Sequence, residues 1–378
     1  MRPDLPLPLD HLVRLTDCFG VIQHATHALP DYKSGYTTDD NARALAVAVK
    51  HYHLHGDQLS RELATRCLAF LMFAQREDGR FQNFIGYDRR YCEEAVSEDA
   101  FGQAFSALGL TLHTPPQPGL VGPAERMFHQ AIPWVDRMEH PRARALCIIA
   151  LYWWSKADTG DARRARETAY PLAQYLVSRY REHSRPDWDW ILPELTYSNA
   201  KLPEALFRAY QMTSNDEFLS VARHSLNFLY EKSILNDVLY LVGNDGWYTS
   251  HERQPALYDQ QPVDAAALVN ASLAAYDATG ETGYLHKAWL SYEWFFGRNL
   301  RGESLYDPET GGCFDALTAN GVNHNRGAES TICLLLAHLS IYEARQQISL
   351  ALLSGRPEER ERVGPPGIAD VSVGAGRA

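Results

Sequence analysis

The chain has 378 residues, of which 45% are hydrophobic and 11% aromatic, so it is long enough to bury a large core. Its net charge of −11 is spread along the sequence, which argues against a nucleic-acid or anionic-membrane surface. No run approaches the roughly 18 apolar residues of a membrane span, and the N-terminus lacks the apolar segment of a secretion signal. We therefore expect a cytoplasmic protein.

The six cysteines are dispersed and include no C-x-x-C pair. This spacing favours reduced thiols over a disulfide framework or a zinc site. We expect no metal and no other cofactor.

Helical periodicity dominates the sequence. The expected helices cover 8–17, 38–55, 58–75, 97–112, 122–136, 140–157, 161–182, 201–213, 215–231, 262–279, 281–298 and 326–347. The best strand-like run, V-L-Y-L-V at 238–242, lies inside a long connection. Residues 1–350 are expected to form one domain, and 351–378, rich in Gly, Pro and charge, a disordered tail.

The connections between these helices alternate in length. Tight turns such as H-G-D-Q at Gly56 and T-G-E-T at Gly280 alternate with long, polar connections. The even-numbered helices are rich in alanine, whereas the odd-numbered ones carry more charge. This pattern predicts an all-α fold, an (α/α)6 toroid of six helical hairpins with an inner and an outer ring. The long loops should then share one face of the toroid, at the start of the inner helices.

Acidic side chains recur where the inner helices begin. They could be ordinary helix caps, and Thr38 is the expected N-cap of the helix at 38–55. Several carboxylates on small-residue helices nevertheless predict a polar cleft, because burying them elsewhere would be costly. The candidate catalytic residues are Asp40, Glu98, Asp99, Asp264 and Glu329.

Aromatic residues accompany these acids in the long loops, as in D-W-D-W at 187–190. Flat apolar rings beside carboxylates and amides suit a sugar, and paired carboxylates are the groups that hydrolyse glycosides. The residues expected to bind the sugar are Tyr36, Asp39, Asn41, Trp188, Trp190, Tyr197, Asn199, Lys201, Tyr258, His324 and Asn325.

Several segments resemble those of six-hairpin (α/α)6 glycosidase-type proteins, over about residues 8–348. They are T-D-D-N-A-R-A-L, S-E-D-A-F-G-Q, L-T-Y-S-N-A-K-L-P-E-A, Q-P-V-D-A-A and G-G-C-F-D-A-L followed by N-H-N-R-G-A-E-S-T. More narrowly, they look like a bacterial module often found with sugar-nucleotide glycosyltransferases. The resemblance implies a carbohydrate substrate and a functional association with such a transferase. The chain has no G-x-G-x-x-G and no Rossmann-like series, so transferase activity of its own is not expected.

The carboxylates favour a glycoside hydrolase that acts on a bacterial oligo- or polysaccharide, and three alternatives stay open. A sugar epimerase or isomerase would use histidines as acid and base, with His24, His251 and His324 as candidates. A polysaccharide lyase would need a cation to neutralise a uronate, such as Arg142, Lys201 or Arg326. A non-catalytic carbohydrate-binding module would depend on its aromatic residues instead.

Overall fold

The computed structural model describes residues 6–92, 96–235, 238–252 and 254–354. Its α-helices there are α1 (Asp10–Arg14), α2 (Thr38–His55), α3 (Gln58–Ala74), α4 (Glu98–His113), α5 (Val121–Val135), α6 (Pro141–Trp154), α7 (Ala162–His183), α8 (Lys201–Thr213), α9 (Asp216–Ser233), α10 (Pro262–Thr279), α11 (Gly283–Glu293) and α12 (Ala328–Ser354). All twelve expected helices are present. The first is shorter than expected, and the last continues into the expected tail, whose residues 355–378 lie outside the described chain.

The strands are short and lie in the connections between helices. The antiparallel pairs are β1 (Ala25–Thr26) with β2 (Leu29–Pro30), β3 (Tyr36–Thr37) with β4 (Phe84–Ile85), β5 (Glu194–Leu195) with β8 (Tyr248–Thr249), β6 (Ile234–Leu235) with β7 (Val238–Leu239), and β9 (Leu317–Thr318) with β10 (Gly321–Val322). The strand expected at 238–242 is present as β7, but β7 covers only residues 238 and 239 of that range. Two 3₁₀ turns, Tyr32–Ser34 and Pro118–Leu120, complete the set.

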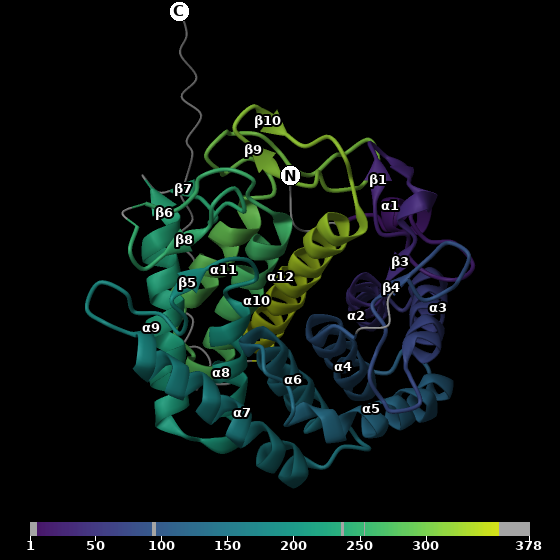
Figure 1. Cartoon of the computed structure of the whole chain (residues 1–378), viewed down its shortest axis with the longest axis horizontal. Helices are drawn as coiled ribbons and strands as arrows, with labels where there is room; N and C mark the ends of the chain where they lie inside the picture. Colours follow the sequence, from purple (N-terminus) through teal and green to yellow (C-terminus); the bar gives the residue numbers. More distant parts are fainter. Residues whose placement is uncertain (1–5, 93–95, 236–237, 253, 355–378) are drawn as a thin grey trace, which may run out of the picture.

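The even-numbered helices close into an inner ring (Figure 1). Each of α2, α4, α6, α8, α10 and α12 packs against the next, and α12 packs against α2. The outer helices α3, α5, α7, α9 and α11 each pack against the inner helix that precedes them in the chain. This arrangement confirms the (α/α)6 toroid.

Burial separates the two rings as the composition predicts. The inner helix α10 buries 13 of its 18 residues, because neighbours cover most of its circumference. The outer helix α7 buries only six of its 22, all alanine, leucine or valine on one stripe. Small residues therefore mark the inner ring because only they let six helices crowd together. No helix of the described chain is both long and apolar enough to span a membrane.

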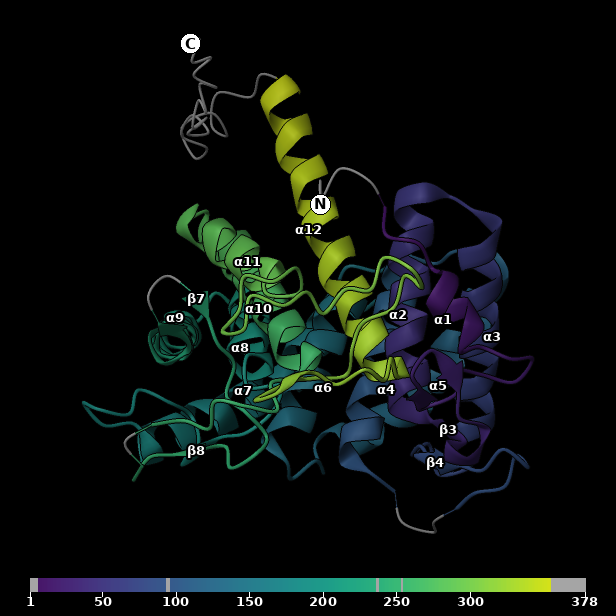
Figure 2. The same cartoon turned by 90° about the horizontal axis from the view of Figure 1, so that it is seen from above.

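The inner helices all begin on the same side of the ring, which we call the mouth. Strands β3, β4 and β8 lie on this side, together with the long connections (Figure 2). Acidic residues in the first turns of inner helices are therefore brought to one end of the toroid.

Two inner helices approach each other closely where α4 carries glycine. A Cβ atom built on Gly109 would lie 2.5 Å from the carbonyl oxygen of Ala150 on α6. A Cβ on Gly102 would lie 2.9 Å from Cδ1 of Leu146, also on α6. The backbone oxygen cannot move aside as a side chain can, so Gly109 is the stricter requirement.

We expect Gly109→Ala to lower the free energy of unfolding by about 1–3 kcal/mol, because the new methyl group forces α4 and α6 apart. Gly122→Ala in α5 is the matched control, since nothing lies within 4 Å of its Cβ position. It should be neutral or stabilise by about 0.4–1 kcal/mol. Urea unfolding of both variants measures the difference. Equal stability of Gly109→Ala and wild type would contradict the close packing.

Candidate active site

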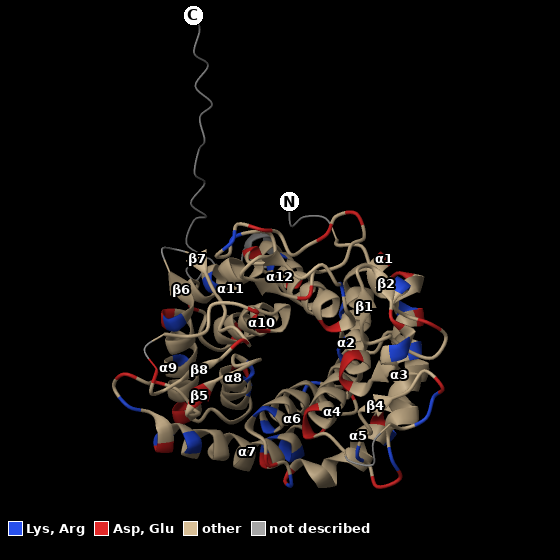
Figure 3. Ribbon diagram, turned by 45° about the horizontal axis from the view of Figure 1, so that its top comes forward, with Lys and Arg blue, Asp and Glu red and all other residues tan. Residues whose placement is uncertain are grey.

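A buried arginine on α2 holds three carboxylates at the mouth. Arg43 Nη1 lies 2.9 Å from Glu329 Oε2 and 3.1 Å from Asp40 Oδ1, and Nη2 lies 3.6 Å from Asp39 Oδ2. Arg43 is only 8% exposed, so these ion pairs offset a charge that would otherwise be costly to bury. We call these four residues the arginine cluster. Figure 3 shows acidic segments of α2, α4 and α12 turned toward the central opening.

The start of α2 sets the spacing of this cluster. Asp39 and Asp40 precede Arg43 by four and three residues, so one face of the helix carries all three. The N-cap is Thr37, not the expected Thr38, because strand β3 keeps Thr37 extended and its side chain accepts from the Asp40 amide. The Thr38 hydroxyl instead donates to the Gln82 carbonyl at 2.5 Å.

Asp99 on α4 lies beside the arginine cluster and lines a cavity of about 720 Å³, which we call the mouth cavity. The charges of Arg43 and Asp39 on α2, and those of Arg142 and His140 at the start of α6, act on the pKa of Asp99. Within the described part of the chain, no hydrogen bond or ion pair holds its carboxyl group. The walls of the cavity come from the starts of α4 and α6, from Tyr175 and Arg179 on α7, and from residues 192–197.

Three carboxyl groups at the mouth, those of Asp40, Asp99 and Glu329, have raised pKa values. Burial raises the pKa of Asp40 to about 8, helped by the Asp39 carboxylate and opposed by Arg43. Burial also raises the pKa of Asp99 and of Glu329, and Arg43 opposes both shifts. The side chain of Glu329 is nevertheless 40% exposed. A carboxyl group whose pKa is raised suits general acid catalysis.

Glu98 is held in a structural contact, although it was expected to be catalytic. Its carboxylate accepts hydrogen bonds from the backbone amides of Glu139 at 2.9 Å and of His140 at 2.8 Å. Those amides precede α6, which begins with Pro141 and has no side-chain cap of its own. Glu98 therefore supplies from α4 the cap that α6 lacks.

Asp264 has a similar position at the start of α10 but is sealed from solvent. Hydrogen bonds from the backbone of Ser198 and Asn199 reach its carboxyl group, just before the uncapped start of α8. Its Oδ2 atom is buried without a partner among the described residues, and burial raises the pKa of Asp264 to about 7. The adjoining cavity of about 20 Å³ has room for one water molecule. Asp264 thus holds the start of α8 against the start of α10.

Three aromatic rings expected to bind sugar are buried. Trp188 and Trp190 are 2% and 0% exposed, and their indole N–H groups donate to the carbonyls of Leu192 and Glu194. Tyr36 is 1% exposed, and its hydroxyl donates to Asp17 at 2.6 Å. These rings form the core of the long loops, because each ring finds its hydrogen-bond partner inside the loop.

Two amides expected to bind sugar are also occupied by the fold. Asn41 accepts from the Val21 amide at 2.8 Å and donates to the Thr37 carbonyl at 2.8 Å. Asn199 closes its own turn, accepting from the Thr196 amide and donating to the Thr196 carbonyl. Neither amide is free for a ligand.

Tyr197 and Lys201 lie where a ligand could reach them. The Tyr197 ring lines the mouth cavity, with the Arg142 guanidinium 3.9 Å from its centre. Lys201 pairs with Glu204 at 2.8 Å and lines a second cavity of about 440 Å³ that continues down the centre of the ring.

The remaining expected residues lie on outer loops of the mouth. His324 is exposed and lies 6.2 Å from the His27 ring, and Asn325 accepts from the His27 amide at 2.9 Å. Tyr258 is half-buried and His251 is exposed. His24 lies close enough to influence Asp315, not the arginine cluster.

The sequence did not single out Arg43 or Asp315. Asp315 accepts from the Gly327 amide at 2.7 Å and from the Ser330 hydroxyl at 2.9 Å, so it caps α12. Arg43 stands between alanines in A-R-A-L-A, and a charge within such a small, apolar helix is the signal that could have revealed it.

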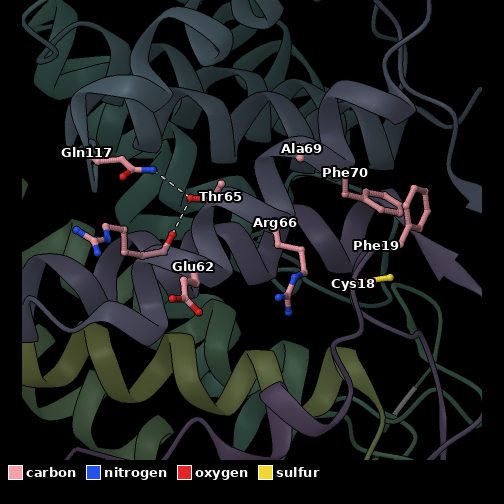
Figure 4. A pocket seen from close by; sticks show the side chains of 9 residues that line it. Cys18, Phe19, Glu62, Thr65, Arg66, Ala69, Phe70 and Gln117 are labelled. Carbon is pink, nitrogen blue, oxygen red and sulfur yellow. Dashed lines mark hydrogen bonds between the residues drawn. The ribbon is translucent and has the colours of Figure 1, made fainter.

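Another cavity of about 720 Å³, the outer groove, lies on the outer surface of α3. Cys18, Phe19 and Phe70 lie at one end of it and Gln117 at the other, with Thr65 between them (Figure 4). Its carboxylate is Glu62, which stands alone, so the outer groove lacks the paired acids of the mouth.

No protein-family model matches the chain, and no curated protein matches its sequence. Solved structures share its fold at low identity. The cellobiose 2-epimerase from Bacillus thermoamylovorans B4167 is 9% identical, with a TM-score of 0.66 over 89% of this chain and 95% of that one. A D-mannose isomerase is 13% identical, with a TM-score of 0.67 over 86% and 92%. The GH76 α-mannanase from Bacteroides thetaiotaomicron is 12% identical, with a TM-score of 0.58 over 83% and 88%.

The chain therefore has the toroid fold of carbohydrate-active enzymes that include both epimerases or isomerases and glycoside hydrolases. At these identities the likeness concerns the fold alone, and the choice between the two reactions depends on the side chains at the mouth.

The raised pKa of Asp264 predicts a pH-dependent contribution to stability. The folded chain keeps this proton to about pH 7, whereas the unfolded carboxyl loses it near its ordinary value of 3.8. The contribution is full below about pH 4 and is lost as the pH rises toward 7. The free energy of unfolding of wild type minus that of Asp264→Asn should fall over this range, by at most about 1.4 kcal/mol per pH unit.

Denaturant unfolding between about pH 4 and pH 8 measures this difference. Asp158→Asn, on the surface, is the matched control for the substitution itself. A difference that stays constant with pH would mean that Asp264 is ionised throughout.

Proposed function

We propose that the chain is a glycoside hydrolase in which Asp99 and Glu329 are the catalytic carboxylates. The observation that carries this proposal is that both acids reach open space at the mouth, from α4 and α12, and influence each other electrostatically. The buried Asp40 and Asp264 and the cap residue Glu98 are less suited, because their oxygens are sealed or already bonded.

The surroundings of the two acids suggest their roles. No ion pair with a described residue holds Asp99, and its raised pKa favours the protonated form that donates to the leaving glycosidic oxygen. Burial raises the pKa of Glu329, but the Arg43 guanidinium at 2.9 Å opposes this shift, and no such ion pair supports an anion at Asp99 among the described residues. Glu329 is therefore the better candidate for the base or nucleophile at the anomeric carbon. Asp40 and Asp39 also contact Arg43, so the arginine fixes Glu329 within a cluster that carries no net positive charge.

Mutation of the two acids tests these roles. Asp99→Asn and Glu329→Gln should each lower turnover of an oligosaccharide by about 10²–10⁴-fold. On an aryl glycoside with a good leaving group, Asp99→Asn should recover much of the loss, because such a bond breaks without an acid. Glu329→Gln should not recover. Reducing-end assays over mannose-, glucose- and galactose-based substrates provide the measurement.

Glu98→Gln is the matched control, since it changes the neighbouring acid on the same helix. It should weaken the cap of α6 and lower stability but leave turnover of the folded protein near wild type. Full activity in both Asp99→Asn and Glu329→Gln would overturn the assignment. Sugar binding without any turnover by wild type would indicate a binding module.

A sugar epimerase or isomerase is the second candidate, favoured by one residue. His140 lines the mouth cavity and influences Asp99 electrostatically, so an imidazole and a carboxyl group face the same space. Such a pair could move a proton at a sugar carbon next to the carbonyl.

Incubation of free mannose, glucose and cellobiose in D₂O separates the two reactions. An epimerase or isomerase would place deuterium on the sugar carbon and form a second sugar, both visible by NMR, and His140→Ala would abolish this. We expect no deuterium in the recovered sugar, because a hydrolase never breaks a carbon–hydrogen bond.

A further inference from the structure

Exposed aromatic rings gather beside the mouth, around strands β3 and β4. Seven large aromatic side chains of the described residues are well exposed, and five of them lie here. These five, which we call the aromatic face, are 36–51% exposed: Tyr32, Phe73, Phe84, Tyr87 and Tyr91. Such a concentration of apolar surface in contact with water indicates a binding surface.

Ring contacts link four of the five rings, and Phe84 joins them through strand β4. Tyr32 lies 5.0 Å from Tyr87, which stacks at 6.1 Å on the buried Tyr36. Tyr36 lies 5.0 Å from Phe19, and Phe19 lies 5.1 Å from Phe73. Rings held by one another in this way lose little freedom when a ligand covers them.

The aromatic face is attached directly to the candidate active site. Strand β4, which carries Phe84, pairs with β3, and β3 leads into α2. Oδ1 of Asn83 accepts from the backbone amides of Thr38 at 3.1 Å and of Asp39 at 3.4 Å. Asp39 belongs to the arginine cluster. A ligand that extends outward from the mouth over α2 therefore meets these rings. Figure 2 shows strands β3 and β4, which carry part of this face, beside α2 and α3.

On its other side the aromatic face joins the outer groove. Arg89, in the loop after β4, places its guanidinium 5.0 Å from the Phe19 ring and contacts the Cys18 sulfur at 3.2 Å. Phe19 and Cys18 form one end of the groove (Figure 4). Further along it lie Arg61 and Arg66, neither of which forms an ion pair with a described residue.

We propose that the aromatic face and the outer groove bind a glycan chain that continues outward from the mouth, which makes the substrate a polysaccharide. This inference rests on the proposed function. Aromatic rings stack on the C–H faces of sugars, while tyrosine hydroxyls and arginine forks bond their hydroxyl groups. Three of the five rings are tyrosines, whose hydroxyl groups can bond to sugar hydroxyls, and this favours a glycan over a lipid.

Affinity electrophoresis tests the proposal in gels that contain soluble mannan, hydroxyethylcellulose or galactan. The proteins carry Glu329→Gln, so that the polymer stays intact. We expect retardation in at least one gel, and the double variant Tyr32→Ala/Tyr87→Ala should weaken the binding about tenfold. Tyr170→Ala is the matched control, because Tyr170 is 43% exposed on the outer helix α7 and should leave binding unchanged.

Equal retardation of the double variant, or no retardation in any of the three gels, would overturn the proposal. Light scattering adds one further outcome, since a dimer that dissociates on Tyr32→Ala/Tyr87→Ala would assign the face to a second copy of the chain. Retardation without hydrolysis by wild type would leave the glycan surface standing and reject the hydrolase. Hydrolysis of short oligosaccharides without retardation would support the hydrolase and reject the glycan surface.

Discussion

The mouth of the toroid depends on the burial of one positive charge. Arg43 projects from a helix of small residues into the ring, where a lone guanidinium would be strongly unfavourable. Three carboxylates therefore have to collect around it, two from its own helix and Glu329 from α12. Burial raises the pKa of Asp40 and of Glu329, neighbouring carboxylates add to the rise, and Arg43 opposes it.

The other acids at the mouth serve the helices. Inner helices α6 and α8 begin without a side-chain cap of their own, and Glu98 and Asp264 reach them from α4 and α10. Asp315 does the same for α12 from the preceding loop. Capping between elements ties neighbouring helix starts together, which helps to hold the mouth at a fixed diameter. Acidic residues at the starts of the inner helices thus have two roles. Some cap a neighbouring helix, and others remain accessible at the mouth.

Local sequence patterns were sufficient for the ring but not for the orientation of its side chains. Helical periodicity and the alternation of Gly56-type turns with long loops predicted the toroid, because they reflect short-range physics. Glu98 and Asp99 are neighbours with the same composition around them, yet one caps α6 and the other faces a cavity. Likewise, Trp188 and Trp190 are ordinary loop aromatics until their N–H acceptors are known. Such choices depend on residues distant in the chain.

The seam between α12 and α2 also bears on how the chain is made. All other neighbours in the inner ring are consecutive hairpins, so they can pack as they leave the ribosome. Within the inner ring, only the seam joins helices from opposite ends of the described chain, as in the contact of Arg43 with Glu329. Until α12 has been synthesised, Arg43 lacks one of its three counter-charges. The helix of the inner ring that is translated last is therefore the one that completes the arginine cluster, and a nascent chain that stops before α12 would hold an open arc in place of a closed ring.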